Sequence, residues 1–188
     1  MKRAFAAVTA VILILIHASL AESDEKTFVP ANDVSFTIST ERSSYRVGEQ
    51  ITLKYRITNI SNAPLYAPQK WEMTCPGGPH VWAWFENSSG HHFVGGYAGS
   101  CSNNPKTVSE RMGKEAVLLK PGEHIDDTFQ LDTTLFGGLK PGEYRIEATL
   151  NGWTEEKFTD AERSELERMG NPFLRGEAPA SMRVTLTP

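Results

Sequence analysis

Histidine and cysteine are the residues of this chain best suited to hold a metal ion, because imidazole and thiolate groups bind zinc and copper. The histidines outside the N-terminal segment follow no H-x-H or H-x₃-H spacing, and adjacent side chains on a strand point to opposite faces. These histidines are His80, His91, His92 and His124. We therefore predict no metal and no cofactor, and we name His80 with His91 as the pair to test if a metal were found.

The chain contains two cysteines, Cys75 and Cys101. An even number of cysteines in an exported chain is typical of a disulfide. In the chain-entropy model, closing a loop of this size stabilises the fold by roughly 3–4 kcal/mol. A pair of metal-binding thiolates is the alternative, but the separation of the two residues matches no metal motif. We predict a Cys75–Cys101 disulfide.

Catalytic motifs are missing from the sequence: neither G-x-S-x-G nor H-E-x-x-H occurs. Adjacent carboxylates occur at Asp126-Asp127 and at Glu155-Glu156, but neighbouring side chains diverge on a strand. Ser100 lies beside Cys101 in a glycine-rich stretch, and no feature marks it as a nucleophile. The sequence therefore favours a protein that is not an enzyme.

Aromatic residues offer the best candidate for a binding surface. On a strand over 81–85, Trp82 and Trp84 point to one face and the apolar residues between them to the other. One interpretation packs a tryptophan inside the fold and covers the rest with the chain itself. The other interpretation is a partner-binding surface, since tryptophan and tyrosine are typical interface anchors, with Trp71 and Tyr97 contributing to it. Exposed aromatic rings also stack on sugars, so a glycan is a further possible ligand.

The first 21 residues have the features of a secretory signal peptide. Lys2 and Arg3 form a basic start, an apolar run covers 4–16, and small residues lie at Ser19 and Ala21. The run is shorter than the roughly 20 residues of a membrane-spanning helix. We expect export to the periplasm or the extracellular space, and no membrane embedding. The net charge of −4 argues against nucleic-acid binding.

Alternating apolar and polar residues predict an all-β fold with about seven strands. The clearest segment is 139–150, where a Pro-Gly turn leads into a strand that carries Tyr144. This arrangement is typical of the tyrosine corner of an immunoglobulin-like Greek-key β-sandwich. The seven predicted strands lie at 34–39, 51–58, 81–86, 116–119, 125–131, within 139–150, and at 182–186.

Two of these strands carry outward charges, Lys54 with Arg56 and Arg145 with Glu147. If the two strands pair, these side chains form one charged and solvated face, which guards against edge-to-edge association.

The sequence further predicts one domain over 34–188, preceded by a flexible lead-in at 22–33. A long central loop separates the early strands from the late ones. An insertion at 151–180 interrupts the strand pattern just before the last strand. Within it, 159–170 predicts a short helix, with a cap at Thr159 or Asp160 and a stop at Gly170.

The strand frame resembles the BsuPI-type intracellular proteinase inhibitor family. The resemblance implies an immunoglobulin-like domain that inhibits a proteinase, although an export signal, the cysteine pair, a longer central loop and the helical insertion depart from the family pattern. The matching stretches are 51–59, 61–64, 81–84, 118–123 and 139–150.

We predict a non-enzymatic module that binds another protein, with proteinase inhibition as its most concrete form. The expected contact residues are Trp71, Trp82, Trp84 and Tyr97. The alternatives are a module for a small ligand, either a glycan or a metal, and a structural envelope domain without a ligand.

Overall fold

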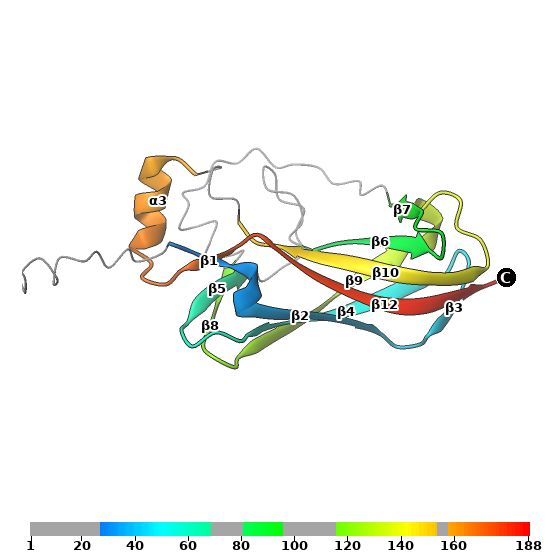
Figure 1. Ribbon diagram of the computed structural model, residues 1–188, viewed down its shortest axis with the longest axis horizontal. Helices are drawn as coiled ribbons and strands as arrows, with labels where there is room; N and C mark the ends of the chain where they lie inside the picture. Colours follow the sequence, from blue (N-terminus) through cyan, green and yellow to red (C-terminus); the bar gives the residue numbers. More distant parts are fainter. Residues whose placement is uncertain (1–26, 69–80, 96–115, 154–157) are drawn as a thin grey trace, which may run out of the picture.

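The computed structural model describes residues 27–68, 81–95, 116–153 and 158–188. Over these residues the protein is an all-β sandwich, as Figure 1 shows. Its elements are β1 (Phe28–Pro30), η1 (Ala31–Asp33), β2 (Val34–Thr40), β3 (Ser44–Arg46), β4 (Gln50–Asn59), β5 (Leu65–Pro68), β6 (Val81–Asn87), β7 (His92–Val94), β8 (Ala116–Leu119), β9 (His124–Asp132), η2 (Thr133–Leu135), β10 (Gly142–Asn151), α3 (Asp160–Glu167), β11 (Phe173–Arg175) and β12 (Glu177–Thr187).

Two sheets form the sandwich. The first has the order β2-β4-β9, and the second has the order β3-β12-β10-β6-β7. The chain passes from β4 in the first sheet to β6 in the second, returns to the first at β9, and ends in the second with β10 and β12. These crossings are the connections of a Greek-key, immunoglobulin-like sandwich. The predicted all-β fold is therefore confirmed, and each of the seven predicted strands is present.

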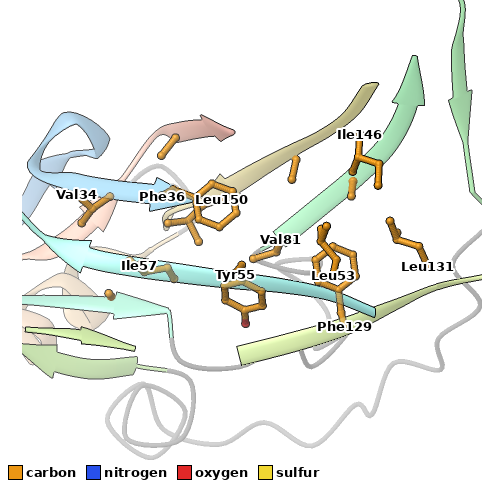
Figure 2. Packing of buried hydrophobic residues seen from close by; sticks show 14 of the residues in the cluster. Val34, Phe36, Leu53, Tyr55, Ile57, Val81, Phe129, Leu131, Ile146 and Leu150 are labelled. Atoms are coloured by element: carbon orange, nitrogen blue, oxygen red, sulfur yellow. The ribbon is translucent and has the colours of Figure 1, made fainter. Parts of the chain in front are cut away.

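The core lies between these sheets, where the inward-facing residues of both sheets meet (Figure 2). Along β4 every second residue is buried, and β6 and β10 show the same alternation. Removing each large apolar side chain from water contributes about 1.5–3 kcal/mol, which is how the alternating pattern selects this packing. Central members of the core are Leu53, Tyr55, Ile57, Val81, Phe85, Ile146 and Leu150.

A third sheet, β1-β11-β5-β8, corrects two expectations about domain organisation. Residues 28–33 are not a flexible lead-in: β1 pairs in parallel with β11, and Phe28 is buried against the rings of Phe158 and Phe173. The 151–180 segment does not merely interrupt the fold, because it supplies β11 and the first residues of β12. The prediction of a flexible lead-in missed β1 because a strand of three residues is too short to show an alternating pattern of apolar and polar residues.

The helix predicted inside that segment is present as α3. Thr159 is its N-cap and forms a capping box with Glu162, in which each side chain bonds the other residue's backbone N–H. Leu166 is its buried residue and holds the helix against the core. In the residues that the structure describes, no helix is long and apolar enough to cross a membrane.

Asn59 ties one end of the sandwich together. Its side chain is fully buried, and its Nδ2 donates to the carbonyls of Ala63, at 2.8 Å, and Leu119, at 2.9 Å. Its Oδ1 accepts from the backbone N–H and the hydroxyl of Ser61, at 2.9 and 2.7 Å. One side chain thereby joins the end of β4, the following turn and the end of β8.

The two charged strands do not form one face, because β4 and β10 lie in different sheets. Lys54 and Arg56 lie on the outer side of the first sheet, where Arg56 pairs with Asp126 on β9. Arg145 and Glu147 lie on the outer side of the second sheet. The molecule therefore presents two separate outer faces, with different partners for their charges.

Candidate functional site

The outer side of the second sheet carries the two described tryptophans of the predicted surface. Val81, Ala83 and Phe85 of β6 point into the core and are almost fully buried. Trp82 and Trp84 point outward, and Trp82 is 37% exposed while Trp84 is half-buried. Of the two interpretations drawn from the sequence, the one that packs a β6 tryptophan inside the sandwich does not hold, because Phe85 fills that place.

Neighbouring strands extend this surface, which we call the outer β6 face. It comprises Trp82, Trp84 and Glu86 on β6, His92 and Val94 on β7, and Arg145 and Glu147 on β10. The register places Trp84 between Val94 and Glu147, and it places Glu86 between His92 and Arg145. The apolar pair of Trp84 and Val94 therefore lies beside charged side chains on one side of the sheet.

Arg145 organises these charged side chains. Its Nη2 lies 3.0 Å from Glu86 Oε2, and its Nε pairs closely with Glu147 Oε1. His92 Nε2 lies 3.4 Å from the same Glu86 oxygen. The hydrogen bond from Arg145 lowers the pKa of Glu86, and the hydrogen bond to Glu86 raises the pKa of Arg145. The Glu86 carboxylate is thus held ionised, and the Arg145 side chain is fixed in place although half of its surface faces solvent.

Trp84 is the half-buried tryptophan of this face and lies beside His92. Its ring centroid is 6.1 Å from that of His92, at an interplanar angle of 42°. Its indole Nε1 is buried and has no hydrogen-bond acceptor among the described residues. The ring is therefore held by packing rather than by a polar contact, which leaves its orientation dependent on the strands around it.

The scaffold beneath the face is aromatic. Tyr144 begins the buried alternation of β10, and its hydroxyl donates to the Lys140 carbonyl at 3.0 Å and accepts from the Lys140 N–H at 3.1 Å. This is the geometry that a tyrosine corner requires. The Tyr144 ring lies edge-on to Phe85 and to Phe93, with centroids 6.1 and 5.8 Å apart. The short strand β7 is thereby packed onto the core through Phe93.

The remaining predicted site residues are not brought together here. Trp71, Cys75, His80, Tyr97 and Cys101 lie outside the described residues. His91 packs edge-on against the ring of Phe93, with centroids 4.7 Å apart. Over 27–68, 81–95, 116–153 and 158–188, no group of three or more histidine, cysteine, aspartate or glutamate side chains could hold a metal ion.

Several residues of the outer β6 face were not predicted from the sequence as site residues, namely Glu86, His92, Val94, Arg145 and Glu147. For His92 and Val94 a local signal exists in the sequence. Asn87 and Gly90 form a tight turn, with Gly90 at a positive φ of 77°, and such a turn folds the following residues back against β6. The contribution of β10 has no such local signal, because it comes from far along the chain.

A groove lies on the first sheet. It encloses about 610 Å³ and is lined by Thr37, Ser39, Lys54, Tyr55, Arg56, Asp126, Asp127 and Thr128. Its charges already pair: Lys54 with Glu41 at 3.1 Å and Arg56 with Asp126 at 2.7 Å. Burial and the Asp127 carboxylate, 3.3 Å from the hydroxyl, raise the pKa of Tyr55. Exposed pairs of this kind are typical of a solvated surface, so this groove is the weaker candidate site.

Comparison with known proteins finds only solved structures of low similarity to this chain. No protein-family model matches the chain, and no curated protein matches it. A β-glucosidase, EmGH1, from Erythrobacter marinus is 15% identical, with a TM-score of 0.42, over 82% of this chain and 15% of that chain. The CARDB domain of the PF1109 protein from Pyrococcus furiosus, solved in complex with di-metal ions, is 14% identical, with a TM-score of 0.37, over 82% and 88%.

A β-glucosidase from Listeria innocua is similar over 81% of this chain and 16% of its own, at 14% identity and a TM-score of 0.36. The chain thus spans less than a fifth of the length of either β-glucosidase. No match supports the BsuPI-type family in particular, and the protein is an immunoglobulin-like module.

Proposed function

We propose that the protein is a non-enzymatic module that binds another protein through the outer β6 face. One observation carries the proposal: Trp82 and Trp84 lie on the outside of the sheet, on the same face as the fixed cluster of Arg145, Glu86 and Glu147. Tryptophan and arginine are the residues most enriched among those that dominate interface energies. In this protein they lie on paired strands rather than on loops.

Ordering of the face before binding favours this function. A free arginine loses rotamer freedom when a partner immobilises it, at a cost of about 0.5–1.5 kcal/mol for such a side chain. Arg145 already contacts Glu86 and Glu147, so part of that cost is met in the unbound protein. The Trp84 ring, which is held by packing, likewise loses little rotamer freedom when a partner binds.

Proteinase inhibition is the most concrete form of this function. It is supported by the resemblance of 51–150 to the BsuPI-type family. In this form the outer β6 face would contact the proteinase and exclude water around Trp82. We also propose that the protein is exported and that 1–21 are removed, which mass spectrometry of the N-terminus in envelope and culture fractions tests.

Affinity capture from envelope and culture extracts tests the binding function, with the purified protein as bait beside Trp82→Ala and Leu118→Ala. Leu118 is a matched control because it is 38% exposed, almost the same as Trp82, but lies on β8. We expect a partner that the wild type and Leu118→Ala retain and that Trp82→Ala loses. A proteinase behaving in this way, and inhibited in solution by the wild type alone, supports the inhibitor.

A different protein captured with the same variant pattern would retain the binding module and exclude inhibition. Equal capture by all three baits would place the contact elsewhere on the molecule. Absence of any specific partner from a correctly folded bait would contradict the proposed function.

A glycan is the second candidate ligand for the same face. Trp82 lies in register with Thr149, and Trp84 with Glu147, so each ring has a hydrogen-bonding side chain beside it. Sugar recognition uses such a combination of an apolar ring and polar neighbours. Glycan-array binding that Trp82→Ala abolishes and Leu118→Ala preserves would favour this candidate over the protein partner.

A further inference from the structure

The strand β7 ends the second sheet, and its backbone offers hydrogen-bonding groups at that edge. The Asn87 N–H donates to the His91 carbonyl at 3.1 Å, and Phe93 is in register with Phe85. Hydrogen-bonded and non-hydrogen-bonded pairs alternate along antiparallel strands. Phe93 therefore takes the bonded position, and His92 and Val94 direct their backbone N–H and C=O groups away from β6. Among the described residues no strand pairs with this side of β7.

The composition of this edge differs from that of the edge strand β9. Natural sheets protect their edges with charged side chains, including charges that point inward. On β9, Asp126 points outward and Asp127 occupies an inward position beside Tyr55. The edge residues of β7 are His92, Phe93 and Val94, with no acidic side chain, lysine or proline. Val94 is 66% exposed, the highest fraction among the exposed large apolar residues described.

The edge is also held rigidly. The turn before β7 is closed by Asn87, whose Oδ1 accepts from the N–H groups of Ser89 and His91, at 3.1 and 2.9 Å. After β7, Gly95 is buried against the ring of Phe136, where a Cβ would lie 2.8 Å from a ring carbon. A strand fixed at both ends loses little freedom when another strand is added to it.

We propose that the β7 edge binds an extended polypeptide segment of a partner protein by strand addition. An apolar side chain of that segment would lie beside Val94, which is in register with Trp84. Strand addition obtains affinity from main-chain hydrogen bonds and specificity from alternate side chains. The inference rests on the proposed function, since it specifies how a protein partner reaches the outer β6 face.

A second copy of this chain is the less suitable occupant. A stable protein interface buries about 800 Å² on each partner. A three-residue strand extends only about 10 Å, at 3.3 Å per residue. Edge-to-edge pairing of two such strands buries far less than that area. An extended segment of a partner is not limited to this length, and beside β7 its side chains would join the outer β6 face, where Val94 lies in register with Trp84.

The test uses the purified isotope-labelled protein and amide NMR. The probe is a synthetic peptide of alternating threonine and valine with lysine at both ends, together with the same peptide methylated on its backbone nitrogens. We expect the unmethylated peptide to shift the amide signals of His92 and Val94 more than that of Phe93. The methylated peptide, which cannot join a strand ladder, should leave all three in place.

Two variants separate backbone from side-chain effects. Val94→Pro removes an edge N–H and should weaken peptide binding about tenfold, the effect of losing one to two net hydrogen bonds. Val94→Lys keeps the N–H but adds a charge of the kind that protects edges, and should weaken binding similarly. Ile60→Lys is its matched control, because Ile60 is 59% exposed at a site away from β7.

Equal shifts from both peptides, or no shift at β7 up to the solubility limit, would overturn strand addition. Concentration-dependent shifts of the same amides without peptide would assign the edge to a second copy and would also overturn it. The proposed function can survive either result. If capture still depends on Trp82 while Val94→Pro has no effect, the partner binds the outer β6 face without strand addition.

Discussion

Replacement of Asn59 tests whether the buried amide closes the end of the sandwich. Asn59→Ala removes two donated and two accepted hydrogen bonds from a side chain with no exposed surface. The Ser61 hydroxyl has one hydrogen and lies 2.8 Å from the Ala63 carbonyl, so once Asn59 Oδ1 is removed it can donate to that carbonyl instead. The bond to Leu119 is the one that lies in a buried environment, so its loss is the main cost.

The magnitude follows from these contacts. A net hydrogen bond contributes about 0.5–1.5 kcal/mol, and a buried group left unsatisfied costs about 1–3 kcal/mol. Water replaces some of the bonds in the partly exposed turn, so the sum is smaller than four separate bonds. We expect Asn59→Ala to lower the free energy of unfolding by about 2–4 kcal/mol.

Asn59→Asp should cost more at neutral pH, because a carboxylate oxygen would then face two carbonyl oxygens. The folded state would raise the pKa of that carboxyl. The extra penalty is therefore complete above that raised pKa, diminishes as the pH falls through it, and is gone below the pKa of an unfolded aspartate. Acidification should bring Asn59→Asp closer to Asn59→Ala.

Urea unfolding at equilibrium measures both effects, with Asn62→Ala as the control. Asn62 has the same side chain in the same turn, but it is exposed. We expect a lower midpoint with an unchanged slope for the Asn59 variants, and a midpoint near that of the wild type for Asn62→Ala. If Asn59→Ala and Asn62→Ala unfold at the same midpoint, the reasoning about this network is refuted.

Three further predictions concern Tyr144, Gly152 and Glu86. Tyr144→Phe removes both hydrogen bonds to Lys140 and should lower stability in urea by about 1–2 kcal/mol; an unchanged midpoint would contradict the tyrosine-corner role. Gly152→Ala would place a Cβ 2.5 Å from a backbone carbonyl of β11, so thermal unfolding should occur at a clearly lower temperature, and an unchanged Tm would show that the two segments can separate freely. The pKa of Glu86 is lowered by the Arg145 hydrogen bond, so its stabilising contribution is present above the pKa of an unfolded glutamate and is lost as the pH falls through the folded value. The difference in urea midpoint between wild type and Glu86→Gln should therefore shrink on acidification, and a constant difference would refute the assignment.

Local patterns in the sequence were sufficient for the fold class. The alternation in 34–39, 51–58 and 139–150 places apolar residues on one side of each strand, and a one-residue shift would expose all of them. The same alternation predicts that Trp82 and Trp84 share a face. The Thr159 cap and the Gly170 stop likewise act within a single turn, so the helix was predictable within a few residues.

Pairing between distant segments could not be predicted in this way. Nothing near Phe28 shows that it lies beside Phe173, and nothing near Lys54 shows that β4 and β10 belong to different sheets. Such partners are chosen by the free energy of burying both faces together, a property of the whole chain.

The candidate site shows the same division. Its aromatic residues come from one strand and were evident from their spacing along the chain. The arginine that fixes the charged side chains comes from β10, and the exposed edge exists because β7 is the last strand of its sheet among the described residues. Alternation along a strand is a local geometric property of the backbone, whereas neighbours across a sheet arise only when distant strands pack.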